Sequence, residues 1–141
     1  MDFVDRVVFG ASTLVSAALM PESMPRRAFV QALRRAEICV SPATLSELET
    51  VLGRSKFDRY LDRPTRDEFL ALYRRHARLY EVDETHERAL KIACRDPRDN
   101  KSLALALSCS AIAMISSDQD LLTLTPYEGI SIVTARLFLD R

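Results

Sequence analysis

The sequence predicts an α/β domain with a mainly parallel central sheet. Short apolar runs, typical of buried strands, alternate along the chain with longer segments whose apolar residues recur at helical spacing. Regular alternation of strands and helices favours parallel strands joined by helices. The chain has 141 residues, which suits one compact domain with a sizeable core. We therefore expect a single domain that covers residues 1–141.

The first elements are predicted from apolar patterns. The run at 7–9 is interpreted as a buried strand because Gly10 and a turn follow it. Helices are expected at 13–20 and 23–35, and the apolar spacing of the second gives it one inward face. The next strand is expected at 38–40.

Proline, glycine and capping patterns predict the elements that follow. Pro42 fits the first turn of a helix over 41–53, where its missing N–H does no harm, and Gly53 is suited to its end. The residues after Pro64 match a capping box, so a helix is expected over 65–76. The remaining expected elements are a strand at 79–82, a helix at 85–93, a helix at 103–107, a strand at 112–115, a turn or helix at 121–122 and a strand at 130–133.

Composition limits the classes of function. The formal charge is zero, with 20 basic and 20 acidic residues, so bulk charge does not indicate nucleic-acid binding. Many basic residues, mostly arginine, fall between Arg26 and Arg78. We interpret most of them as solvated helix surface, although arginine also suits phosphate. No apolar run approaches the roughly 20 residues of a membrane-spanning helix. Acidic residues precede the first apolar stretch, so a cytoplasmic location is expected.

The cysteines give no sign of a disulfide framework. Cys39, Cys94 and Cys109 are odd in number, widely spaced and surrounded by apolar residues, and they form no CxxC pair. We predict that they are reduced and mostly buried thiols.

Polar groups follow several of the predicted strands. In parallel sheets the functional site lies beyond the carboxyl ends of the strands. Gly10 follows the first strand, residues 41–47 follow the second, and residues 118–120 follow the strand at 112–115. Asp99 opens the helix that precedes this last strand. We therefore expect these groups to converge at one edge of the sheet.

Each acidic residue in these segments also has a possible structural role. Asp99 precedes a helix and is suited to capping it. Glu47 could close a capping box with Thr44. Glu47 and Glu49 border the apolar stripe of their helix on opposite sides, so spacing alone does not choose between them.

Asp118 and Asp120 allow the same two interpretations. Both could be turn residues after a strand, with Asp120 capping the turn at 121–122. Two acids two positions apart at the carboxyl end of a strand favour a functional role instead.

Four segments, in order, resemble the motifs of the PIN family, and more closely those of the VapC-type toxins of toxin–antitoxin modules. The segments are Val7–Ala17, Ser41–Leu52 followed by Arg54–Phe57, Asp96–Lys101 with the alanine–leucine run after it, and Ser116–Leu122. The resemblance implies a three-layer α/β/α fold with a mainly parallel sheet. It also implies a divalent-metal-dependent ribonuclease that cleaves single-stranded RNA.

Carried over by position, the resemblance implies a set of site residues. Glu47, Asp99 and Asp118 would be the catalytic, metal-binding carboxylates, and Asp120 would support them or supply a further ligand. Mg²⁺ and Mn²⁺ prefer such hard oxygen ligands. In phosphodiester hydrolysis these ions activate a water, polarise the phosphate and stabilise the leaving oxygen.

One position departs from the family pattern. Gly10 stands where the family has its first metal-binding aspartate, and Ser12, at the family's Ser/Asn position, fixes this alignment and would support the site. Asp2 and Asp5 are no substitute, because they precede the strand and would lie at its far end. We therefore expect weak binding of Mg²⁺ or Mn²⁺ and reduced or absent turnover.

Two functions from different classes follow from this departure. One is a weakened ribonuclease toxin; the other is a catalytically inactive PIN-fold module that binds an antitoxin or RNA. The resemblance further implies a cognate antitoxin as protein partner and a homodimer.

Overall fold

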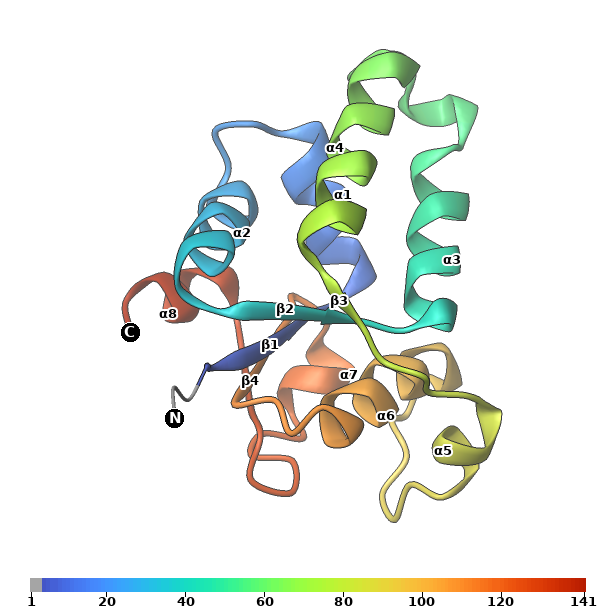
Figure 1. Ribbon diagram of the computed structural model, residues 1–141, viewed down its shortest axis with the longest axis vertical. Helices are drawn as coiled ribbons and strands as arrows, with labels where there is room; N and C mark the ends of the chain where they lie inside the picture. The colour runs from blue at the N-terminus through green and yellow to red at the C-terminus, as the bar shows by residue number, and fades with distance from the viewer. Residues whose placement is uncertain (1–3) are drawn as a thin grey trace.

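The computed structural model describes residues 4–141, so the expectation for Asp2 lies outside the described residues. Its centre is a five-stranded sheet in the order β3-β2-β1-β4-β5, and every neighbouring pair of strands is parallel (Figure 1). The strands are β1 (Arg6–Phe9), β2 (Glu37–Val40), β3 (Arg78–Leu79), β4 (Ala113–Ile115) and β5 (Ser131–Val133). The α/β class and the parallel sheet predicted from the sequence are confirmed.

Helices cover both faces of the sheet and complete the three layers. The helices are α1 (Ala11–Leu19), α2 (Met24–Arg35), α3 (Pro42–Leu52), α4 (Arg63–His76), α5 (Glu84–Arg88), α6 (Asn100–Ser108), α7 (Gln119–Leu122) and α8 (Ala135–Leu139), with single 3₁₀ turns η1 (Ser55–Phe57) and η2 (Pro97–Asp99). α1 to α4 and α8 pack on one face, and α6 and α7 pack on the other (Figure 1). None of the described helices is long and apolar enough to cross a membrane.

Strand residues alternate between two hydrophobic cores. Val7 and Phe9 of β1 join the core under α1 to α4, whereas Val8 joins the core under α6 and α7. Ala113 and Ile115 of β4 likewise face the first core, with Met114 between them facing the second. A strand places successive side chains on opposite faces, so strands buried on both faces read as continuous apolar runs. Cys39, Cys94 and Cys109 are free and buried, as predicted.

The first turns of α3 and α4 differ in how they are capped. In α3, Ser41 Oγ accepts from the Thr44 N–H at 3.2 Å and Thr44 Oγ1 accepts from the Ser41 N–H at 2.9 Å. This reciprocal capping box leaves Glu47 without a capping role. α4 begins at Arg63, after Asp62, rather than at Thr65. The predicted capping box is wrong, because Thr65 lies inside the helix and does not cap it. Its Oγ1 instead donates to the side chain of Asp62, 2.6 Å away.

Other elements are shorter than predicted or were not predicted. β3 covers Arg78–Leu79 instead of 79–82, because only these residues pair with β2. α5 ends at Arg88 instead of residue 93. α8 was not predicted; Thr134 caps it, and Phe138 is its buried anchor.

Candidate functional site

A cavity of about 830 Å³ opens beyond the carboxyl ends of β1 and β4. Gly10, Ser12, Glu47, Asp99 and Asp118 all line it. These residues come from four separate segments of the chain, and the parallel sheet brings their elements to one edge. The expected convergence of polar groups at this edge is therefore present.

Asp99 and Asp118 place two carboxyl groups together in this cavity. Asp118 Oδ1 accepts the Asp120 N–H at 2.8 Å, and the Asp118 N–H donates to Ser116 Oγ at 3.0 Å, so the Asp118 side chain is held at the start of α7. Partial burial, followed by the nearby charge of Asp118, raises the pKa of Asp99 to about 6. Two carboxylates this close repel each other, so their arrangement is favourable mainly when a cation lies beside them.

Only some of the capping roles considered for these acids are present in the structure. Asp99 stands at the N-cap position of α6, but its side chain accepts no capping hydrogen bond within the described chain. Asp96 caps η2 instead by accepting the Arg98 N–H at 3.0 Å. Asp118, and not Asp120, caps α7. Asp120 lies in the first turn of α7, outside the lining of the cavity.

Glu47 faces the cavity but carries a counter-ion from its own chain. Its Oε2 lies 2.9 Å from Nζ of Lys101, which also donates to the Arg98 carbonyl at 2.6 Å. Both side chains of the pair are partly buried. Glu49, the alternative on α3, pairs with Arg74 of α4 at 2.9 Å and does not line the cavity. Of the two glutamates on α3, only Glu47, which the family resemblance favours, lines the cavity.

The backbone at Gly10 does not require glycine. Its φ of −66° and ψ of 152° are ordinary extended values, and its N–H donates to the Ile115 carbonyl at 2.8 Å. An added Cβ would lie 3.4 Å from Ser116 Oγ and 3.5 Å from the Ile115 carbonyl oxygen, which are ordinary contacts. A larger residue can therefore begin its side chain here without moving the strand.

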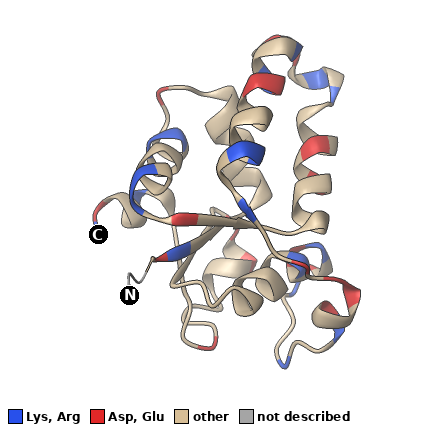
Figure 2. Cartoon of the chain, viewed as in Figure 1, with Lys and Arg blue, Asp and Glu red and all other residues tan. Residues whose placement is uncertain are grey.

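Sequence reasoning assigned no role to Lys101, although it lines the same cavity. Its contact with Glu47 joins residues 54 positions apart, and no local pattern predicts such a pair. Arg54 and Lys56 also line the cavity, so basic groups share it with the acids. Figure 2 shows basic residues at the turn that joins α3 to α4.

A sequence model of the PIN domain matches residues 6–120, which is more than half of the chain. The chain belongs to the PIN domain family. No curated protein matches the sequence significantly.

Several solved structures share this fold. VapBC2 of Rickettsia felis, bound to a promoter DNA fragment, gives a TM-score of 0.62 at 11% identity over 90% of this chain and 96% of that one. VapC20 of Mycobacterium tuberculosis, a toxin that cleaves the sarcin–ricin loop, gives 0.58 at 12% identity over 89% and 98%. FitAcB of Neisseria gonorrhoeae gives 0.56 at 14% identity over 92% and 98%. At these identities the likeness establishes the fold.

The carboxylates of this PIN domain fit a divalent cation in part. Within residues 4–141, no three His, Cys, Asp or Glu side chains form a cluster close enough to hold a metal ion. Asp99 and Asp118 supply two adjacent oxygen donors of the hard type that Mg²⁺ and Mn²⁺ prefer. Glu47 faces the same cavity, but the ammonium of Lys101 neutralises it. The site therefore offers two available acids and a third that is paired.

Proposed function

We propose that this PIN domain is a divalent-metal-dependent ribonuclease of the toxin type whose activity is weakened at Gly10. Glu47, Asp99 and Asp118 would hold Mg²⁺ or Mn²⁺. The observation that carries the proposal is the meeting of Asp99 and Asp118 in one cavity, with the pKa of Asp99 raised to about 6. A bound cation would offset both the burial and the repulsion from Asp118 that raise this pKa.

The residues of the chain would divide the work of binding and orientation. A bound Mg²⁺ or Mn²⁺ supplies an activated water and polarises the phosphate. The Asp120 N–H holds Asp118 Oδ1, which orients this carboxylate, so Asp120 would support the site through its backbone. Arg54 and Lys56, on the wall of the same cavity, would bind RNA phosphates.

Gly10 would lower activity because it contributes no side-chain ligand and no negative charge. Ser12 lines the cavity and offers a hydroxyl, but a neutral oxygen does not replace the missing charge. Weak binding of the cation and slow turnover are the expected results.

The proposed partners follow from the family and from the structural relatives. A cognate antitoxin is the proposed protein partner, and the likeness to VapBC2 and FitAcB supports it. RNA as substrate, a homodimer, a single domain over 1–141 and a cytoplasmic location are proposed with it.

A second candidate function is a PIN module that binds an antitoxin or RNA without cutting. The Lys101–Glu47 ion pair favours it, because a cation supplied by the chain already occupies one carboxylate. Together with Gly10, this pair would leave Asp99 and Asp118 as the available acids.

A ribonuclease assay on unstructured RNA in Mg²⁺ and in Mn²⁺ tests both candidates. The samples are this chain, Gly10→Asp, Asp118→Asn and the double variant that combines the two changes. Cutting by Gly10→Asp that the double variant lacks supports a disarmed nuclease with the proposed ligands. Cutting by this chain that Asp118→Asn abolishes, at a rate equal to that of Gly10→Asp, means that Gly10 does not weaken the site. If no sample cuts, the proposal of a metal-dependent ribonuclease is wrong and the binding module takes its place.

A further inference from the structure

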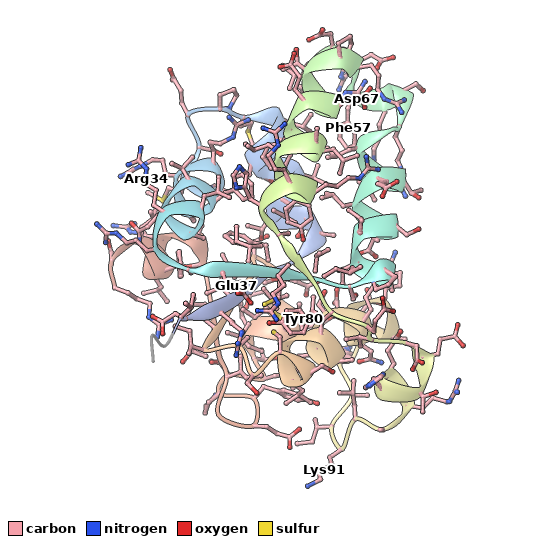
Figure 3. All side chains as sticks on the ribbon, viewed as in Figure 1. Arg34, Glu37, Phe57, Asp67, Tyr80 and Lys91 are labelled. Carbon is pink, nitrogen blue, oxygen red and sulfur yellow. The ribbon has the colours of Figure 1, made fainter. Side chains whose placement is uncertain are left out.

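The turn between α3 and α4, residues 54–60, combines three properties, of which the proposed function uses only the basic charge. It is basic, it carries two aromatic rings, and it is anchored by a buried arginine. Figure 1 shows it at the end of the α3–α4 hairpin farthest from the sheet, and Figure 3 labels Phe57 close to this end. We call it the 54–60 turn.

Arg66 holds the 54–60 turn in a fixed shape. Its side chain is 1% exposed, although most arginines of the helices were interpreted as solvated. Its Nη1 donates to the Leu52 carbonyl at 2.7 Å and to the Arg54 carbonyl at 3.0 Å, and its Nη2 donates to Asp58. One buried guanidinium therefore fixes both the end of α3 and the middle of the turn. Groups held in this way lose little entropy when a ligand binds.

The anchored turn presents Tyr60 and its basic groups outward, whereas Phe57 is partly buried. Tyr60 is 59% exposed, and the Arg59 guanidinium lies 5.0 Å from the centre of its ring and donates to its hydroxyl at 2.9 Å. Nζ of Lys56 lies 5.2 Å from the centre of the Phe57 ring. Exposed aromatic rings beside cations are the groups on which the bases of single-stranded nucleic acids stack while phosphates are neutralised.

The turn is continuous with the proposed active site. Arg54, Lys56 and Phe57 line the cavity that contains Asp99 and Asp118. A second hollow of about 580 Å³ lies on the turn itself, lined by residues 55–60. Lys56 and Phe57 belong to both hollows and connect them. A strand of RNA with its phosphate in the cavity can therefore continue onto the turn.

We propose that the 54–60 turn is a stacking platform for single-stranded RNA, which places a base on Tyr60 and phosphates on Lys56 and Arg59 beside the carboxylate cavity. The platform rests on the proposed function, because it positions the substrate of that same site. RNA fits the turn better than an acidic protein segment does, since carboxylates would use the cations and leave the exposed ring of Tyr60 without a flat partner. Duplex RNA fits less well because its bases are already stacked.

The test measures binding of a short oligouridylate with one central 2-aminopurine, in EDTA so that cleavage is prevented. Anisotropy gives the affinity at several salt concentrations, and 2-aminopurine fluorescence reports stacking. Tyr60→Ala is expected to weaken binding about tenfold and to abolish the fluorescence quenching, because one stacked base is lost. Tyr60→Phe keeps the ring and is expected to bind within about twofold of the unaltered chain.

Lys56→Gln separates charge from stacking. It is expected to lower the slope of log affinity against log salt by roughly 0.7, the value for one phosphate contact on a single strand, whereas Tyr60→Ala leaves the slope unchanged. Arg34→Gln, an exposed change on α2 at the other side of the molecule (Figure 3), is the matched control and is expected to change neither quantity. Thermal melting checks that Tyr60→Ala is folded.

The results distinguish failure of the platform from failure of the proposed nuclease. If Tyr60→Ala binds and quenches like the unaltered chain, the platform is wrong, while cutting by Gly10→Asp would leave the nuclease in place. Binding that depends on Tyr60, without cutting by Gly10→Asp, retains the platform and rejects the nuclease. If a labelled polyglutamate peptide binds through Tyr60 and the oligouridylate does not bind, the turn is a protein-docking surface and the inference is overturned.

Discussion

Lys101, at the start of α6, reaches Glu47 in the middle of α3, and Nζ lies 2.9 Å from Oε2. The same ammonium donates to the carbonyl of Arg98 in η2. The contact joins the two segments that supply Glu47 and Asp99 to the cavity. A metal ion that recruits Glu47 must compete with this ammonium.

Replacing Lys101 with Met is expected to raise the affinity for Mn²⁺. The change frees Glu47 and removes one positive charge from the cavity, and the gain is expected to be roughly fivefold, which corresponds to about 1 kcal/mol. Isothermal titration calorimetry measures it, with the exposed Lys91→Met as control. An unchanged affinity would mean that the ion pair does not restrict the site.

Gly10→Asp is expected to supply a further metal ligand without disturbing the fold. The nearest contacts of an added Cβ are ordinary, so we expect the melting temperature in EDTA to stay close to that of the unaltered chain. Mn²⁺ affinity is expected to rise about tenfold or more, since even outer partners of metal ligands change affinity by that factor. Gly10→Asn has the same shape without the charge and serves as control. Equal Mn²⁺ affinity in this chain and in Gly10→Asp would show that position 10 is not a ligand position.

Glu37 is expected to make stability depend on pH. Burial alone would raise the pKa of this carboxyl, but hydrogen bonds from Tyr80 and Arg6, together with the charge of Arg78, outweigh burial and hold the pKa below its usual range. Figure 3 shows Glu37 and Tyr80 pointing toward one another. Because the folded-state pKa is lowered, the contribution is present above the unfolded pKa and is lost as pH falls through the folded pKa.

Glu37→Gln should therefore lower the free energy of unfolding at neutral pH and have a smaller effect in acid. Urea denaturation across the acidic range checks this, and Glu81→Gln, an exposed acid near the end of β3, provides the comparison. A destabilisation that is constant with pH would contradict the assigned charge network.

Arg66→Met is expected to destabilise the protein by about 2–4 kcal/mol, because the buried carbonyl of Leu52 and the partly buried carbonyl of Arg54 lose their donor. Hydrogen exchange should accelerate in residues 54–60 before it changes in the sheet. Arg63→Met, whose side chain is exposed, is expected to change stability by less than about 0.5 kcal/mol. Equal effects of the two variants in urea denaturation would reject the anchoring role of Arg66.

The central sheet could be predicted because its strands are buried on both faces. Val7, Val8 and Phe9 are all apolar since they alternate between two cores, and such runs stand out in the sequence. β3 was misplaced because its extent depends on pairing with β2 and not on its own composition. The start of α4 was misplaced because Thr65 bonds to Asp62 across the first turn, whereas the pattern read Thr65 as the cap.

The candidate site could be predicted as a set of acids but not as an arrangement of charges. Family motifs pointed to Glu47, Asp99 and Asp118, and topology places all three around one cavity. The neutralising contact of Lys101 depends on how α3 and α6 are packed, which no local spacing encodes. The buried environment of Arg66 depends in the same way on where the end of α3 lies relative to the start of α4.

The ordinary contacts that an added Cβ would make at Gly10 bear on how this position can change by mutation. Glycine and aspartate codons can differ by a single base, and the extended backbone at position 10 admits either residue. An exchange between glycine and aspartate at position 10 would therefore change folding stability little. Selection on activity, and not on folding, would determine which residue is retained. If the proposed role of position 10 holds, one base change separates this chain from a more active nuclease, and one base change leads back.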